Sequence, residues 1–258
     1  MKGEQLSLDF GEEVASRKPF VPFKMRVMFK GTFACYTNPM TRTERLTYSI
    51  PTPSGLRGAV SSIYWHPGID WVVDKVVVLN KFEFENIKMH EMKDKINPNK
   101  IFKEIMTGVA GSCIDNERTL RLTHCLVDVA YLVEFHFREQ FHEKNQLPPT
   151  QLMRKSIKLM CDKLKKHSCF KQPYLGLRQY PCLFKGIFSK EEFDELAEQS
   201  YYKGTYEEFP MLFDGFTYDK YNRRIVDKKF LYNAIMKDGI VDFETLRKTE
   251  LRRHRWIH

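Results

Sequence analysis

The sequence predicts an α+β fold in which a ferredoxin-like N-terminal domain precedes a smaller β-rich C-terminal region. Two observations predict it. Strand-like and helical segments follow one another as strand, helix, strand, strand, helix, strand, which is the order of a split βαβ sandwich. Beyond about residue 190, aromatic, charged and turn residues mix as in a small accessory region. The expected parts are a flexible tail at 1–20, the ferredoxin-like domain at 21–190, the accessory region at 191–246 and a basic tail at 247–258.

The first strand is expected from Phe23, where apolar and basic residues begin to alternate. The apolar set is Phe23, Met25, Val27 and Phe29, and the basic set is Lys24, Arg26 and Lys30. Side chains of a strand point alternately to its two faces. The pattern therefore predicts a strand with one face on the core and one basic face in water.

The first helix is expected within SIPTPSGLRGAVSSIYWHP. Thr52 or Ser54 is a suitable cap, a proline is tolerated in the first turn, and Pro67 ends the pattern. The apolar residues at helical spacing are Leu56, Val60, Ile63 and Tyr64. The GLRG step resembles the GxxG of a KH module, and with Arg57 it suggests a phosphate seat at the helix start. Close packing of the helix start explains the glycines equally well.

Two further strands are expected at Ile69 to Leu79 and Leu126 to Phe137, because both segments are rich in β-branched and aromatic residues. The stretch between them, about 88–123, has no clear period and is expected to be an insertion or a hairpin. After the second helix, Pro173 to Phe188 again has strand-like character.

The second helix, from about Thr150 to Ser168, carries the strongest functional pattern. Its apolar face consists of Met153, Ile157, Met160 and Leu164. Residues 154–171 hold one acid, Asp162, against Arg154, Lys155, Lys158, Lys163, Lys165, Lys166 and Lys171. A charge run is often only a solvated face. Like charges at helical spacing repel, however, so this one-sided excess favours contact with RNA or DNA.

The overall charge agrees, since 42 Lys and Arg against 33 Asp and Glu leave +9, which favours a polyanionic partner. No segment reaches the roughly 18 apolar residues of a membrane helix. The six cysteines have no zinc-type spacing, and we expect reduced thiols in a soluble cytoplasmic protein.

No cofactor and no metal are expected, because the chain has no Walker A loop, GxGxxG, HExxH, GxSxG or acidic cluster for two-metal chemistry. His66 ends the first helix and His167 the second, so either can meet a phosphate. If the protein cuts a phosphodiester, the sequence favours metal-free chemistry.

Three separated blocks carry a resemblance to a known family. They are RLTYSIPTPSGLRGAVSSIYWHPGIDWVVDKVVVL (Arg45 to Leu79), RLTHCLVDVAYLVEFHF (Arg121 to Phe137) and CFKQPYLGLRQYPCLF (Cys169 to Phe184). Together with KFLYNAIMKDGIVDF (Lys229 to Phe243), they resemble the Cas5 family of CRISPR-associated proteins, most closely its type I-C, or d, variant.

The resemblance implies an RRM-like RNA-binding fold of the repeat-associated (RAMP) class. Members of the family cap the 5′ end of the guide RNA, and the type I-C variant also cuts the precursor RNA at each repeat hairpin. Such a protein stays in a surveillance complex with the backbone, large and small subunits, and duplex DNA is a possible non-specific partner.

In the family, cleavage depends on a tyrosine in the first helix and a Lys-His pair at the start of the second. By resemblance the tyrosine falls on Tyr64 and the pair on Lys155 and Ser156, so the family histidine is absent. His66 or His167 is the candidate substitute. The expected RNA contacts are Arg45, Arg57, Lys158, Lys165, Lys166 and Arg178.

Two hypotheses remain open. In one, the protein is a metal-independent endoribonuclease that processes repeat RNA through attack by the 2′-OH. In the other, it is a non-catalytic subunit that caps the guide RNA. Cleavage of repeat RNA in EDTA distinguishes them.

Overall fold

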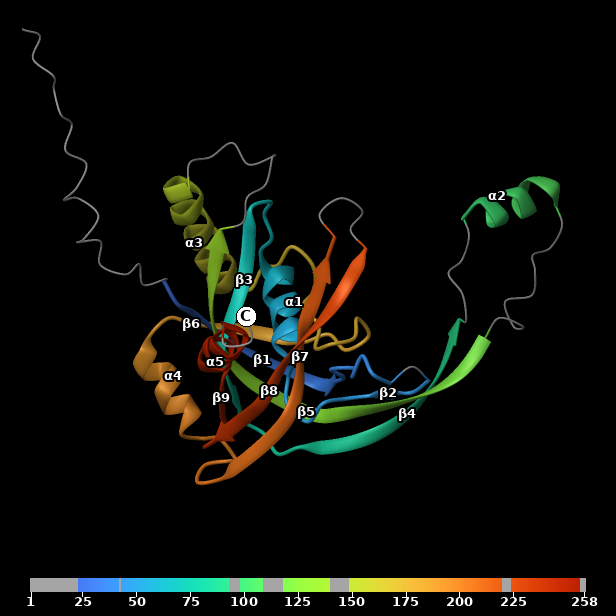
Figure 1. Cartoon of the computed structure of the whole chain (residues 1–258). Coiled ribbons are helices and arrows are strands. Elements are labelled where there is room, and N and C mark those ends of the chain that lie inside the picture. Colours follow the sequence, from blue (N-terminus) through green and yellow to red (C-terminus); the bar gives the residue numbers. More distant parts are fainter. Residues whose placement is uncertain are drawn as a thin grey trace, which may run out of the picture.

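The computed structural model describes residues 23–41, 43–92, 98–108, 118–139, 149–219 and 224–255. In these residues helices pack on a nine-stranded, mostly antiparallel sheet (Figure 1). The strand order is β6-β1-β5-β3-β9-β8-β7. The two remaining strands, β2 and β4, both pair with β5. This confirms a mixed architecture of helices and antiparallel strands. The tail predicted at 1–20 lies outside the described residues.

The first strand is β1 (Met25–Ala34), which lies between β5 (Arg118–Glu139) and β6 (Leu183–Ile187). Val27 and Phe29 are fully buried, as the alternation predicts. The prediction of a wet basic face was wrong at Arg26. Its Nε donates to Glu134 Oε2 at 2.9 Å, and its guanidinium lies 5.7 Å from the ring of Phe193. Phe193 belongs to α4 (Lys190–Ala197), a later helix that covers this face of the sheet.

Two helices cover the opposite face, namely α1 (Pro53–Ile63) and α3 (Pro149–Lys165). The Thr52 hydroxyl caps α1 by accepting from the Gly55 N–H at 3.3 Å. The helix ends at Ile63, earlier than Pro67 predicts, because Tyr64 already has an extended backbone. Both helices contribute to the main core together with the buried face of β1, β3 and β5.

The strand β3 (Ile69–Val78) confirms the second predicted strand and pairs with β5 and with β9 (Ile240–Asp242). Through β9, the long hairpin of β7 (Tyr206–Tyr218) and β8 (Ile225–Lys237) joins the same sheet. The basic tail predicted at 247–258 is helical to Arg255, within α5 (Phe243–Arg255). Arg247 anchors it by donating from Nη1 to the Val73 carbonyl at 2.7 Å.

A two-stranded ribbon projects from this body (Figure 1). It pairs β4 (Glu83–Met92) with the first half of β5 and carries α2 (Pro98–Thr107) at its tip, while the short β2 (Arg45–Leu46) lies along it. The predicted insertion at 88–123 thus starts earlier and contains regular structure. Most of β4 is exposed on both faces, so its strand leaves no apolar alternation in the sequence.

The described cysteines are free, as expected, and burial raises the pKa of the Cys182 thiol to about 12. Cys113 lies outside the described residues. Among the helices that the structure describes, none is both long and apolar enough to cross a membrane.

Candidate functional site

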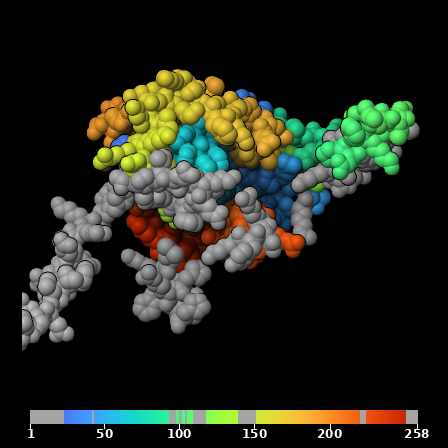
Figure 2. All heavy atoms as spheres, turned by 90° about the horizontal axis from the view of Figure 1, so that it is seen from above, coloured from blue at the N-terminus to red at the C-terminus, as the bar shows by residue number. Residues whose placement is uncertain are grey.

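The chain that leaves α3 crosses the end of α1. The Phe170 N–H donates to the carbonyls of Ser62 and Ile63, both at 3.0 Å, and the Lys171 N–H donates to Ser62 at 2.9 Å. The last carbonyls of a helix have no partner within the helix, so this loop satisfies them. Figure 2 shows the result: the yellow residues of α3 and its following loop lie beside the cyan residues of α1. The loop that follows α3 therefore meets the C-terminal end of α1.

Tyr64 follows the last residue of α1 at this crossing, and its contacts are with Trp71 of β3. Only 7% of its surface is exposed, and its ring packs edge-to-face against Trp71 with centroids 6.3 Å apart. The Trp71 indole N–H donates to the Tyr64 carbonyl at 2.8 Å. The hydroxyls of Tyr36 and Tyr131 are buried in the interior, but that of Tyr64 is not among the sealed hydroxyls of the described residues. Tyr64 is thus a core residue at the edge of the surface.

The two candidate histidines lie on the two segments that meet here: His66 follows α1, and His167 follows α3. His66 Nδ1 lies 2.6 Å from the Pro67 carbonyl, and His167 Nδ1 lies 3.2 Å from the Phe184 carbonyl. A carbonyl only accepts hydrogen bonds, so each Nδ1 carries the proton and donates it. In the neutral ring this leaves the lone pair on Nε2, the form that a general base requires.

The outer face of α3 is cationic and uncompensated. Arg154, Lys155 and Lys158 are exposed, and so are Lys165 and Lys166 near the helix end. Within the described part of the chain, no salt bridge joins any of these five to a carboxylate. Lys165 instead lies 5.6 Å over the exposed ring of Phe188. This surface is suited to phosphates.

Ser156 occupies the opposite face of the same helix. It lies one turn from Leu152 and one turn from Met160, which both belong to the core, and it is fully buried. Among the residues that the structure describes, its hydroxyl finds no hydrogen-bond partner. A side chain in this position does not reach a bound substrate. The catalytic place of Ser156 stays a prediction, and its burial favours a packing position.

The remaining predicted contacts lie apart from one another. Arg45 is on the ribbon, where Nη2 lies 2.8 Å from Glu91 Oε2, so its charge is largely offset. Arg178 is exposed in the loop before β6. Arg57 faces the other flank of α1, away from α3, and its nearest carboxylate is Asp70 at 4.0 Å.

Sequence reasoning did not select two exposed aromatic residues at the crossing. Trp65 and Phe170 are 53% and 57% exposed, and the Lys171 ammonium lies 5.4 Å from the Phe170 ring. Exposed aromatic rings among cations are typical of surfaces that stack unpaired bases. One signal in the sequence indicates them: Trp65 and Phe170 are aromatic residues in the polar segments that follow the two helices.

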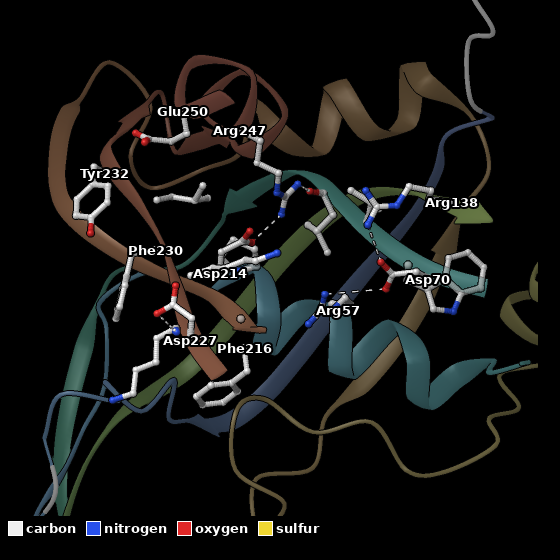
Figure 3. Close-up of a pocket in the computed structure, with 18 residues that line it drawn as sticks. Arg57, Asp70, Arg138, Asp214, Phe216, Asp227, Phe230, Tyr232, Arg247 and Glu250 are labelled. Carbon is white, nitrogen blue, oxygen red and sulfur yellow. Dashed lines mark hydrogen bonds and ion pairs between the residues drawn. The ribbon is translucent and has the colours of Figure 1, made fainter. Parts of the chain in front are cut away.

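A pocket of about 620 Å³ lies along the other flank of α1. It is bounded by α1, the start of β3, the β7–β8 hairpin and α5 (Figure 3). Arg57, Arg138 and Arg247 reach it from three different elements. Neither Arg138 nor Arg247 was selected from the sequence, because nothing local distinguishes them from other surface arginines.

Among the described residues, no group of three or more His, Cys, Asp and Glu side chains is arranged to hold a metal ion. The candidate groups are two imidazoles and a phenol on the segments that follow α1 and α3, and a row of ammonium groups along α3. Such a set can bind phosphates, accept a proton and donate one.

Comparison with known proteins gives consistent matches. A family model described as CRISPR-associated protein (Cas_Cas5), of the Cas5d type, matches residues 25–244. A protein of Mannheimia succiniciproducens named CRISPR pre-crRNA endoribonuclease Cas5d is 27% identical over 235 residues, or 89% of this chain and 99% of that protein. A protein of the same name from Thermus thermophilus is 29% identical over 161 residues, or 62% of this chain and 63% of its own length. A solved structure of a CRISPR-associated protein superposes with a TM-score of 0.63 at 26% identity, covering 86% of this chain and 92% of its own.

Proposed function

This chain belongs to the Cas5d branch of the Cas5 family of CRISPR-associated proteins, and from that premise we propose that it is a metal-independent endoribonuclease acting on CRISPR precursor RNA. One of the two relatives named as such an endoribonuclease matches 89% of this chain and 99% of its own length. The structural observation that carries the proposal is the uncompensated cationic face of α3 beside the end of α1.

The proposed reaction uses the RNA's own 2′-OH as the nucleophile. The 2′ oxygen attacks the adjacent phosphorus, the bond to the 5′ oxygen breaks, and a 2′,3′-cyclic phosphate and a 5′-OH are formed. His66 or His167 takes the proton from the 2′-OH at Nε2. Tyr64 orients the 2′-OH or donates a proton to the leaving 5′ oxygen. Lys155 neutralises the charge of the phosphorane.

The RNA is proposed to lie along α3, with its phosphates on Lys155, Lys158, Lys165 and Lys166. Unpaired bases then reach Trp65 and Phe170 at the crossing, where aromatic surface is exposed to water. Stacking on aromatic rings and pairing of phosphates with cations are the two general sources of affinity for single strands.

The experiment is incubation of the pure protein with end-labelled repeat RNA in EDTA. A single cut that leaves a 2′,3′-cyclic phosphate supports the proposal. A requirement for a divalent ion, or cuts at many positions, contradicts it. Repeat RNA with a 2′-deoxy substitution at the cleavage position is the matched control, because it lacks the nucleophile and must stay intact.

A second function has one observation in its favour. By the resemblance, Ser156 stands where the family has a histidine, and its side chain is buried. A member without the imidazole is suited to binding the 5′ handle of the guide RNA without cutting it. In this case the same assay gives tight binding and intact RNA.

For the fold we infer the ferredoxin-like, RRM-like arrangement of RAMP proteins over 21–190. The order β6-β1-β5-β3, with α1 and α3 as the crossover helices, supports it. The proposed partners are repeat and guide RNA and the backbone, large and small subunits of a type I-C surveillance complex, with duplex DNA as a non-specific ligand.

A further inference from the structure

We propose that the pocket on the β7–β8 flank of α1 binds one unpaired nucleotide of the repeat RNA, with the phosphate on Arg57 and Arg138 and the base against Phe216 and Phe230. This inference rests on the proposed function. It adds a second binding site, separate from the face of α3.

The cationic side of the pocket is built around one carboxylate. Asp70 Oδ2 lies 3.0 Å from Arg138 Nη2, and Asp70 Oδ1 lies 4.0 Å from Arg57 Nη1. Two guanidinium groups thus share a single negative charge. Their side chains are 70% and 42% exposed, so both have N–H donors left for a ligand. Arginine forks match the oxygen atoms of a phosphate.

The backbone beside Arg57 is shaped to admit its guanidinium. Gly215 lies at a register shift of β7, with φ of +153°. A Cβ atom at this position would lie 3.3 Å from an Arg57 amino nitrogen, which is closer than most contacts allow. The glycine therefore leaves room for the arginine at the pocket wall.

The third arginine fixes the inner wall. Arg247 Nη2 lies 3.0 Å from Asp214 Oδ1 in addition to its bond with the Val73 carbonyl. With both sides of its fork engaged, Arg247 serves as a support. The pocket is also lined by Asp227, whose carboxylate Oδ1 accepts from the Lys228 N–H at 2.7 Å.

The opposite side of the pocket is aromatic. Figure 3 shows Phe230 and Tyr232 across the pocket from the Arg57–Asp70–Arg138 group, with Phe216 below. Phe216 and Phe230 both pack on Phe213, with centroids 4.8 and 5.8 Å from it, so their rings are held in place. A cationic side facing an aromatic side matches the two parts of a nucleotide.

The position of the pocket connects it to the proposed cleavage site. Trp71 lines the pocket, and the same indole holds the ring and the carbonyl of Tyr64. An RNA strand that passes the end of α1 therefore has the cationic face of α3 on one side and the pocket on the other. The nucleotide in the pocket would fix the register of the strand relative to Tyr64.

The test uses the full chain and repeat RNA with 2-aminopurine placed at each unpaired position in turn. We expect one position to change its fluorescence on binding, and Phe216→Leu and Phe230→Leu to abolish that change. Arg57→Gln and Arg138→Gln should each weaken RNA binding about tenfold and reduce the salt slope by about one. Lys190→Gln is the matched control, because it removes one exposed charge on α4, at the opposite face of the sheet.

Thermal melting of each variant establishes that it is folded. Unchanged binding and fluorescence in folded Arg57 and Phe216 variants would overturn the inference while leaving the proposed function intact. Adenosine 5′-monophosphate is the second probe. If it binds with the same dependence on these residues while RNA binding does not depend on them, the pocket is a site for free nucleotides and the inference is wrong. If wild type binds no RNA, the inference and the proposed function both fail.

Discussion

The indole N–H of Trp71 donates to the main-chain carbonyl of Tyr64 at 2.8 Å, and the two rings meet edge-to-face. Trp71 also packs edge-to-face on Phe135 and Phe137 of the central strand. The backbone at the end of α1 is therefore tied to the centre of the sheet. Tyr64 is the C-cap of α1 and has an extended backbone. Its carbonyl is therefore held by the Trp71 indole and not by a hydrogen bond of the helix.

Trp71→Phe should keep most of the aromatic packing but leave the Tyr64 carbonyl without its donor. We expect a loss of about 1–3 kcal/mol in the free energy of unfolding, measured by urea denaturation. Cleavage should fall more than RNA binding, because Tyr64 is displaced. Trp65→Phe is the control, since Trp65 is exposed and its indole supports no such contact; equal destabilisation by both changes would argue against this role of Trp71.

Lys158→Ala should weaken binding of all RNA sequences to a similar extent. Its ammonium is exposed on α3 and is proposed to contact a phosphate, so its loss releases one counterion fewer. The slope of log K against log salt should decrease by about one. Fluorescence anisotropy over a salt series measures it. Lys190→Ala on α4 should leave the slope unchanged, and an equal change in both variants would mean that only net charge matters.

The sequence predicted those parts of the fold in which one face of an element is buried. The strand at Ile69, the strand around Val133 and both long helices have core residues at regular spacing, and the structure contains them. The ribbon strand β4 escaped prediction, because its exposed faces impose no apolar period. The face of β1 that carries Arg26 was predicted to be exposed to water. It is covered by α4, which lies more than 150 residues later in the chain, so no local pattern indicates the burial.

The candidate site was predictable only where local sequence determines it. The charge of α3 is visible in the sequence, and the exposed lysines agree with a phosphate-binding role. The grouping of Arg57 with Arg138 and Arg247 was not predictable, because their elements meet only when the β7–β8 hairpin joins the sheet through β9. Long-range pairing of this kind leaves no local pattern.

Gly176→Ala should be strongly destabilising. Its φ of +82° is unfavourable for other residues, and an added Cβ would overlap the Cys35 carbonyl. We expect a loss of about 3 kcal/mol or more, measured as a fall in the urea midpoint. Gly58→Ala is the opposite case, because no atom lies within 4 Å of its added Cβ and the position is helical. It should stabilise α1 by up to about 1 kcal/mol.

Stability should depend on Glu244 in acid. Hydrogen bonds from Lys248 and then Lys24 lower the pKa of this carboxyl from its ordinary 4.5 to about 2. A lowered pKa in the folded state stabilises the protein above pH 4.5, and that stabilisation is lost as the pH falls toward 2. Glu244→Gln should therefore cost about 0.5–1 kcal/mol at pH 6, a small value because the side chain is partly exposed, and less at pH 3. A gap that grows in acid would contradict this assignment.

The double variant His66→Ala, His167→Ala tests the source of the general base. Both rings hold Nδ1 on a carbonyl and present Nε2, so either can accept the proton of the 2′-OH. Loss of a general base typically costs 10²- to 10⁴-fold in rate. We expect single-turnover cleavage in EDTA to fall by that range while RNA affinity changes little. Neither ring supports the core, so the melting temperature should be close to that of wild type.

The two single variants decide which imidazole acts. If one alone reproduces the loss, that ring is the base, and added imidazole should restore part of its rate without restoring that of Lys155→Ala. Cleavage at the wild-type rate by the folded double variant would remove both histidines from the mechanism and leave Tyr64 and Lys155 as the groups to test.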